Sequence, residues 1–252
     1  MTHVVAPSAT ASEQSWRPVR RTRTHELVIE AIEEQIITGA LGVGDPLPPE
    51  RDLAARLEVS RPAVREALRV LEAQGVIRSG VGSGSEAGTF VAAQPAEALS
   101  RLLRLHLALS NFAFGDVVEA RVALERSSVI LAAQATSHAD AAAALTAMES
   151  AGEDRAAYGA ADAAFHIALA QASGNRLVTA LTVAIRNAQR VALLAAFDEV
   201  ADWPTLRDAL TAQHRDILSA VTAGQPERAA ELVEEHIRTA YRRLPALHQS
   251  QL

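Results

Sequence analysis

The spacing of apolar residues predicts three helices in the first part of the chain. Apolar positions recur at helical spacing over 24–38, and shorter helices are predicted over 50–57 and 61–74. The segment GALGVGDPLPP, rich in glycine and proline, separates the first two helices. Ser60 is a favourable N-cap for the third helix, and Gly75 ends it.

A hairpin and a long helical region follow. Short β-type runs at 76–78 and 89–91 flank the segment SGVGSGSEAG, which predicts two strands joined by a long tip. Three helices followed by such a hairpin form a winged helix-turn-helix. Beyond Gln94–Pro95 the pattern predicts only helices with short loops, which indicates an antiparallel bundle. The predicted helices cover residues 96–110, 115–135, 138–151, 154–173, 175–198, 204–223 and 226–244.

We therefore expect a mainly α protein with two domains. A winged helix-turn-helix over 23–92 is joined by a linker, 93–100, to an all-helical antiparallel bundle over 101–244. Residues 1–22 are predicted to form a flexible tail that ends in a basic arm, and 245–252 a second tail.

Composition narrows the classes of protein. Apolar residues make up 49% and charged residues 21%, as in globular proteins. The chain has no cysteine, which excludes disulfides, thiolate metal sites and cysteine nucleophiles. We see no apolar run of about 18 residues and no secretory signal pattern, so we expect a cytoplasmic protein without a membrane partner.

All 24 basic residues are arginine, and the net charge is −6. A genomic base bias explains the missing lysine, and the acidic balance argues against indiscriminate binding to nucleic acid. It leaves room for a local basic face. The arm before the first helix is one such cluster, and we expect Arg20 and Arg23 within it to contact DNA phosphates.

The third predicted helix has an apolar face and a basic face. The apolar positions lie at i, i+4 and i+7: Val64, Leu68 and Leu71. The arginines lie on another face, about 6 Å apart along the axis: Arg61, Arg65 and Arg69. Glu66 and Glu72 are expected to point elsewhere. A row of arginines on one helix face suits phosphates and guanine edges in a major groove. The alternative is an ordinary arginine face exposed to solvent.

The segment GALGVGDPLPPERDLAARLEVSRPAVREALRVLEAQGVI, followed by AGTFV, resembles the winged-helix domain of GntR-family bacterial transcription regulators. The resemblance implies that Arg51 contacts DNA, that Arg61 and Arg65 enter the major groove and that Ser60 caps their helix beside a phosphate. It also implies that a wing glycine such as Gly82 approaches the minor groove. The wing departs from the family pattern because it is long and has no basic residue at its tip.

Four polar residues in the predicted bundle suggest a metal site. Asp162 and His166 are spaced i, i+4 and share one helix face, and His214 and His236 belong to two later helices. All have apolar neighbours at helical spacing, so we expect them to face the bundle interior, where an unpaired carboxylate is costly. A divalent cation would satisfy the group, and separate hydrogen-bonded core histidines are the alternative.

The segments DVVEARVALE, FHIALAQASGNRLVTAL and HRDILSAVTAGQPERAAELVEEHI resemble the FCD domain, the effector-binding domain of the FadR subfamily. The resemblance implies one divalent metal ion per chain at the four residues, with zinc first and nickel, manganese or iron as alternatives. It implies that Arg121 grips an anionic effector, whereas an ion pair with Glu125 is the other interpretation. Asn187 and Arg190 are further candidates to line the effector pocket.

These features favour a homodimeric transcription regulator that binds a palindromic double-stranded DNA operator. The resemblance implies repression that is relieved by an organic-acid effector. A metal ion that the protein leaves partly open favours a small hydroxy- or dicarboxylate, because a carboxylate with a neighbouring hydroxyl can chelate it. A non-haem iron oxygenase is a second hypothesis, but a third histidine fills a position which that chemistry needs open. A DNA-packaging protein is a third, and the acidic composition argues against it. We therefore expect a DNA-binding protein and not an enzyme.

Overall fold

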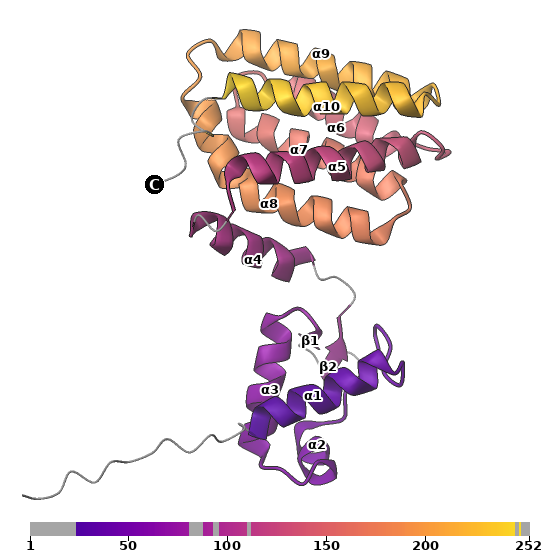
Figure 1. Cartoon of the computed structure of the whole chain (residues 1–252), viewed down its shortest axis with the longest axis vertical. Helices are drawn as coiled ribbons and strands as arrows, with labels where there is room; N and C mark the ends of the chain where they lie inside the picture. Colours follow the sequence, from indigo (N-terminus) through magenta and orange to yellow (C-terminus); the bar gives the residue numbers. More distant parts are fainter. Residues whose placement is uncertain (1–23, 81–87, 93–95, 110–111, 245–246, 248–252) are drawn as a thin grey trace, which may run out of the picture.

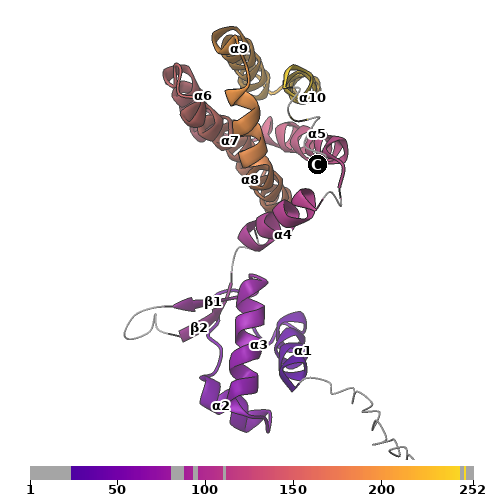
Figure 2. The same cartoon turned by 90° about the vertical axis from the view of Figure 1, so that its left-hand side faces the viewer.

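The computed structural model describes residues 24–80, 88–92, 96–109, 112–244 and 247. The N-terminal part consists of α1 (Thr24–Ile37), α2 (Glu50–Arg56), α3 (Arg61–Ala73), β1 (Ile77–Gly80) and β2 (Gly88–Val91). Its helices surround a core of their own, which includes Val64 and Leu71 with no exposed surface. Figures 1 and 2 show these elements as a compact unit at one end of the molecule.

Local sequence determines where α3 begins and ends. Ser60 has extended backbone angles, and its Oγ accepts a hydrogen bond of 3.4 Å from the backbone N–H of Ala63, as expected of an N-cap. Gly75 follows the helix with a φ of 73°, a left-handed conformation that glycine adopts without strain. Pro49, by contrast, gives α2 no side-chain cap. Both ends of α3 are therefore set by single residues.

The two strands pair antiparallel, with Ile77 opposite Val91 and Gly80 opposite Gly88. The loop before α2 joins their edge, because the backbone N–H of Leu47 donates to the carbonyl of Thr89 at 2.8 Å. This pairing anchors the base of the wing beside α3. The predicted tip and its Gly82 lie outside the described residues.

The C-terminal part is a bundle of long helices. Its elements are α4 (Ala96–Ala108), α5 (Phe114–Ala132), α6 (Ala139–Ser150), α7 (Arg155–Ala172), α8 (Arg176–Asp198), α9 (Trp203–Thr222) and α10 (Pro226–Arg243). Helix α5 packs on α10, α6 on α7, and α4 on α8. In Figures 1 and 2, α4 lies between the N-terminal unit and the rest of the bundle.

The bundle has a second, separate core, and α7 runs through its centre. Tyr158, Phe197 and Trp203 meet edge to face or tilted, with ring centroids 5.0–6.0 Å apart. On α7, Phe165 has no exposed surface. Polar side chains on the same face of α7 are therefore held inside the bundle.

Helix α8 has the length and composition that would also suit a membrane span. It packs against α4, α5 and α7, and it carries the buried Arg186. These are features of a helix inside a bundle.

The mainly α architecture with a winged helix-turn-helix and a helical bundle is confirmed, and each predicted bundle helix is present within three residues of its expected ends. Helix α4 begins at Ala96, so 96–100 of the predicted linker is helical. The tail 1–22, the basic arm with Arg20 and Arg23, and most of the tail 245–252 lie outside the described residues.

Candidate metal centre and nucleic-acid interface

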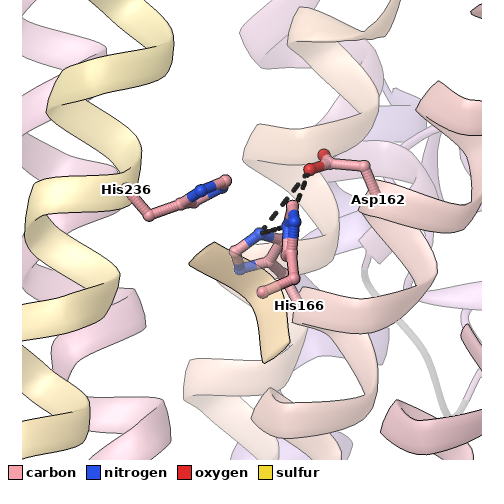
Figure 3. Close-up of side chains that lie close together, drawn as sticks. Asp162, His166 and His236 are labelled. Carbon is pink, nitrogen blue, oxygen red and sulfur yellow. Dashed lines mark hydrogen bonds and ion pairs between the residues drawn. The ribbon is translucent and has the colours of Figure 1, made fainter. Parts of the chain in front are cut away.

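The four residues singled out in the bundle meet at one point. Asp162 and His166 lie one turn apart on α7, His214 lies on α9 and His236 on α10. All four are buried, and one ligand atom from each lies within 4.8 Å of the others. Figure 3 shows Asp162 and His166 projecting from one helix toward His236 on the facing helix.

Each imidazole ring is fixed by a partner at Nδ1. His166 Nδ1 lies 2.7 Å from Glu125 Oε2, His214 Nδ1 lies 2.8 Å from the carbonyl of Leu210, and His236 Nδ1 lies 3.0 Å from Gln213 Oε1. Carboxylate, carbonyl and amide oxygens only accept hydrogen bonds, so each Nδ1 carries the proton. In the neutral rings the Nε2 atoms then carry lone pairs.

These lone pairs are crowded together. His166 Nε2 and His214 Nε2 are 3.1 Å apart, and Asp162 Oδ1 lies 3.1 Å from His214 Nε2 and 3.7 Å from His166 Nε2. Acceptors that face one another without a proton repel, and a cation between them removes the repulsion. Histidines that donate Nδ1–H to a fixed partner and offer Nε2 to a common point are the usual arrangement of a metal site. The donor set therefore fits a divalent cation.

The Asp162 carboxylate has a cationic partner within the protein that the sequence did not reveal. Arg186 on α8 is buried, and its Nη1 donates to Asp162 Oδ2 at 2.7 Å. Its Nη2 donates to both oxygens of Glu125, at 2.9 and 2.8 Å. The protein itself thus balances the charge of Asp162, and the case for a cation rests on the three imidazoles.

Burial and charge set the protonation states of the group. Burial raises the pKa of Asp162 and of Glu125, but Arg186 and the neighbouring histidines together, with Arg121 added at Glu125, outweigh burial and hold both pKa values well below their ordinary range. Burial, with help from Arg186, lowers the pKa of His166 to about 4. Burial and the neighbouring His214 lower the pKa of His236. The site therefore holds ionised carboxylates, with His166 and His236 in the neutral form that a metal requires.

A small cavity of about 30 Å³ adjoins the cluster. Its lining combines apolar surface from Gly159, Ala163, Leu193 and Leu247 with the polar or charged side chains of Arg121, Asp162, Arg186, Gln189 and Arg190. This volume admits a water molecule but not an organic acid. Binding of a larger molecule therefore requires the cavity to widen.

The structure places the three effector candidates differently. Arg121 lines the cavity and also makes the alternative ion pair, with its Nε 3.1 Å from Glu125 Oε1. Arg190 is exposed and lines the cavity. Asn187 is not part of the lining: it is exposed on α8, and its Nδ2 lies 3.5 Å from Ser100 Oγ on α4.

Sequence reasoning missed Arg186 and Gln189 and read Glu125 only as a partner of Arg121. A signal for the first two was present, because both interrupt the long apolar run LVTALTVAIRNAQRVALLAAF at i, i+3 spacing. A charged residue in such a run needs a buried partner. The sequence did not reveal which partner, because Glu125 lies 61 residues away.

The arginines of α3 are exposed as expected, but acids accompany them. Arg65 is bound by Glu50 of α2, with Nη2 2.9 Å from Oε2, and this hydrogen bond lowers the pKa of Glu50. The expectation that Glu66 points elsewhere was wrong, because its Oε2 lies 3.8 Å from Arg69 Nη1 one turn along the helix. Among the described residues, no hydrogen bond or ion pair engages Arg61.

Arg51 and Ser60 lie at the N-terminal ends of α2 and α3. Both are exposed, and the Arg51 Nε lies 3.3 Å from Asp52 Oδ1. The N-terminal turn of α3, with Ser60 and Arg61, is free of covering protein within the described part of the chain. This is the end of a recognition helix that approaches base edges in helix-turn-helix proteins.

Comparisons with known proteins agree with both parts of the fold, the N-terminal winged helix and the C-terminal bundle. Residues 24–86 match the family of bacterial regulatory proteins called gntR, and 116–239 match the FCD domain. The chain is 30% identical over 227 residues to the Glc operon transcriptional activator of Escherichia coli K12. The alignment covers 87% of this chain and 88% of the activator. It is 29% identical to the transcriptional repressor NanR of Edwardsiella tarda, in an alignment that covers 95% of this chain and 92% of NanR.

A solved structure supports the fold. The GntR protein of Streptococcus agalactiae superposes with a TM-score of 0.57 at 24% identity and covers 86% of this chain and 99% of its own. The N-terminal winged helix, the C-terminal helical bundle and the two family matches lead to one assignment: the chain belongs to the GntR family of DNA-binding bacterial transcription regulators and carries an FCD effector domain.

Proposed function

We propose that the protein is a repressor that leaves its operator when a small organic acid binds in the bundle beside a metal ion. The observation that carries this proposal is the convergence of three imidazole Nε2 atoms and Asp162 Oδ1 next to an arginine-lined cavity. The exposed arginines of α3 supply the DNA-binding surface, with Arg61 and Arg65 directed to bases and Arg51 and Arg69 to the backbone or nearby bases.

Asp162, His166, His214 and His236 would hold one divalent ion, with zinc as the first candidate and nickel, manganese or iron as alternatives. When bound, the ion supplies a Lewis acid that attracts a carboxylate. Glu125 and Leu210 hold the His166 and His214 rings in the required tautomer. Such partners of metal-binding histidines typically change metal affinity 10- to 100-fold.

Charge favours an anionic effector. Without metal, the buried pair Asp162 and Glu125 is balanced by Arg121 and Arg186. A divalent ion adds two positive charges, and Arg190 at the cavity adds another. In a water-poor site this excess positive charge is relieved by an anion with one or more carboxylates. Arg121 and Arg190 line the cavity, and we expect both to contact the anion.

We also propose that the protein acts in the cytoplasm as a homodimer on a palindromic operator. The apolar face of α4 supports dimerisation, because Leu102 and Leu105 are each 52% exposed and Leu109 in the following turn is 69% exposed. Residues at i, i+3 and i+7 lie on one helix face, and a second copy would cover this stripe. Two recognition helices then face two half-sites.

Elemental analysis of protein purified without chelator or histidine tag tests the metal. DNA selection from a random pool tests sequence-specific DNA binding. Titration of organic acids on the selected complex then tests release of the DNA by an effector. We expect about one metal ion per chain, a palindromic selected sequence, and release by an acid only when metal is present. Metal-free protein that releases DNA at the same acid concentration would contradict the proposal.

A further inference from the structure

Three buried polar atoms among the described residues have no hydrogen-bond partner in the protein, and all three are on α8. They are Thr182 Oγ1 and both polar atoms of the Gln189 amide, Oε1 and Nε2. Thr182, Arg186 and Gln189 are spaced i, i+4 and i+7 along α8, so all three lie on the inward face of the helix. Buried polar groups are almost always paired, and an exception calls for an explanation such as a bound water, ion or ligand.

Gln189 is the one of these residues that reaches the cavity. Its side chain lines the same cavity as Asp162, Arg186 and Arg121, while only 5% of the residue is exposed to solvent. Leaving both ends of a buried amide unpaired destabilises the folded protein. Neither packing nor an internal hydrogen bond explains a glutamine at this position, whereas a polar molecule in the cavity, first water and then a ligand that displaces it, pairs with the amide.

The unpaired amide indicates which chemical group it meets. Its N–H atoms need an acceptor, and its carbonyl oxygen needs a donor. A carboxylate only accepts and would leave Oε1 unpaired. A hydroxyl group both donates and accepts, so one hydroxyl satisfies each end of the amide. Carboxylates already have better partners here in the arginines.

We propose that Gln189 is the specificity-determining residue of the effector site and binds a hydroxyl group of the effector, so that the protein selects a hydroxy acid over the corresponding plain acid. This inference rests on the proposed binding of an organic acid in the bundle, and it adds a residue and a substituent to it. The carboxylate is bound by the arginines and the metal, and the hydroxyl by the amide of Gln189.

Three matched pairs of acids test the proposal by calorimetric titration of the zinc-loaded full-length protein. The pairs are acetate and glycolate, propionate and lactate, and succinate and malate. Because a hydroxyl beside a carboxylate also chelates metal, the informative quantity is the change in preference between wild type and Gln189→Met. We expect the preference for the hydroxylated acid to fall about tenfold in the variant. The plain acid should bind as before.

A matched substitution controls for the change of side chain. Gln171 is exposed on α7, so Gln171→Met should leave the preference, the metal content and the melting temperature unchanged. In the absence of any acid, Gln189→Met should melt about 2–4 °C higher than wild type, because it removes an unpaired buried amide. A glutamine with a structural role would instead lower the melting temperature when replaced.

The outcomes are distinguishable. If plain and hydroxylated acids bind but the preference is the same in wild type and Gln189→Met, the role of Gln189 is wrong while the proposed regulator stands. If no acid binds the zinc-loaded wild type, the effector proposal fails and this inference fails with it. Should Gln189→Met not fold, Gln189→Leu provides the second test, because it also lacks hydrogen-bonding atoms and should show the same fall of about tenfold in preference for the hydroxylated acids.

Discussion

Arg186 binds one oxygen of Asp162, and the other oxygen of that carboxylate faces the histidines. The Arg186 Nη1 lies 2.7 Å from Oδ2, while Oδ1 lies 3.1 Å from His214 Nε2. The arginine thereby fixes the carboxylate in the orientation that a metal requires. It also balances the charges of Asp162 and Glu125, so we expect the bundle to fold without metal.

Replacing Arg186 by methionine should strongly destabilise the metal-free protein. Asp162 and Glu125 would remain buried without their main cationic partner, and removal of one member of such a group typically costs about 3–5 kcal/mol. Zinc should recover part of this loss, because the cation neutralises the same carboxylates. Urea unfolding with and without zinc measures both effects.

The exposed Arg176 on the same helix offers a control for the Arg186 variant. Arg176→Met should change the free energy of unfolding by less than about 0.5 kcal/mol. If zinc stabilised Arg186→Met less than it stabilises wild type, the assignment of Arg186 as the balancing charge would be wrong.

The fold followed from the sequence because its signals are local. Ser60, Gly75 and the apolar stripe of α3 set that helix through residues within one or two turns, and the bundle helices were separated by glycine, proline and capping residues. The i, i+4 pair of Asp162 and His166 shared a face by helix geometry alone.

The partners of the site did not follow, because they are set by tertiary packing. Arg186 meets Glu125 across 61 residues of sequence, and only the packing of α8 on α5 and α7 brings these groups together. The same applies to Glu50, which reaches Arg65 from a neighbouring helix. Sequence periodicity shows that a residue faces the interior, and it does not show which residue lies opposite.

Stability of the metal-free protein should fall as the pH drops from about 6.5 toward 4. Burial and Arg186 lower the pKa of His166 from 6.5 to about 4 in the folded state, so the unfolded chain binds the proton more readily. The stabilisation is fully present above pH 6.5 and is lost as the pH falls toward the folded pKa, by up to about 3 kcal/mol. Urea titrations at intervals of pH measure the slope.

His166→Gln is the matched test of that slope, because the amide does not titrate. The pH dependence between 6.5 and 5, above the range where most carboxylates titrate, should be reduced in this variant. An unchanged slope would assign the pH dependence to other groups.

Replacing His214 by alanine should remove the metal and raise the acid concentration needed to release DNA. His214 has no exposed surface and its Nε2 contacts both Asp162 and His166, so no solvent ligand replaces it. Coupling between sites of this kind is typically about 5- to 150-fold. DNA affinity without acid should change far less, because the α3 arginines belong to the other domain. Metal analysis and DNA titration measure the two effects, and a variant that retains metal would contradict the ligand assignment.

Arg61→Ala and Arg65→Ala should each reduce discrimination between the selected operator and random DNA by about 5- to 150-fold. Arg20→Ala or Arg23→Ala should instead weaken binding to both DNAs equally and reduce the salt dependence. A bidentate guanine contact is worth about 1–3 kcal/mol of discrimination, whereas a phosphate contact carries no sequence information. Glu50→Gln is the informative companion, because Glu50 accepts hydrogen bonds from two nitrogens of Arg65 and places a negative charge beside the DNA-binding face. Without it, binding to random DNA should tighten while the preference for the operator falls, since the arginine loses its fixed orientation. Fluorescence anisotropy at several salt concentrations separates these cases, and full operator preference in Arg65→Ala would refute the assignment of α3 to the major groove.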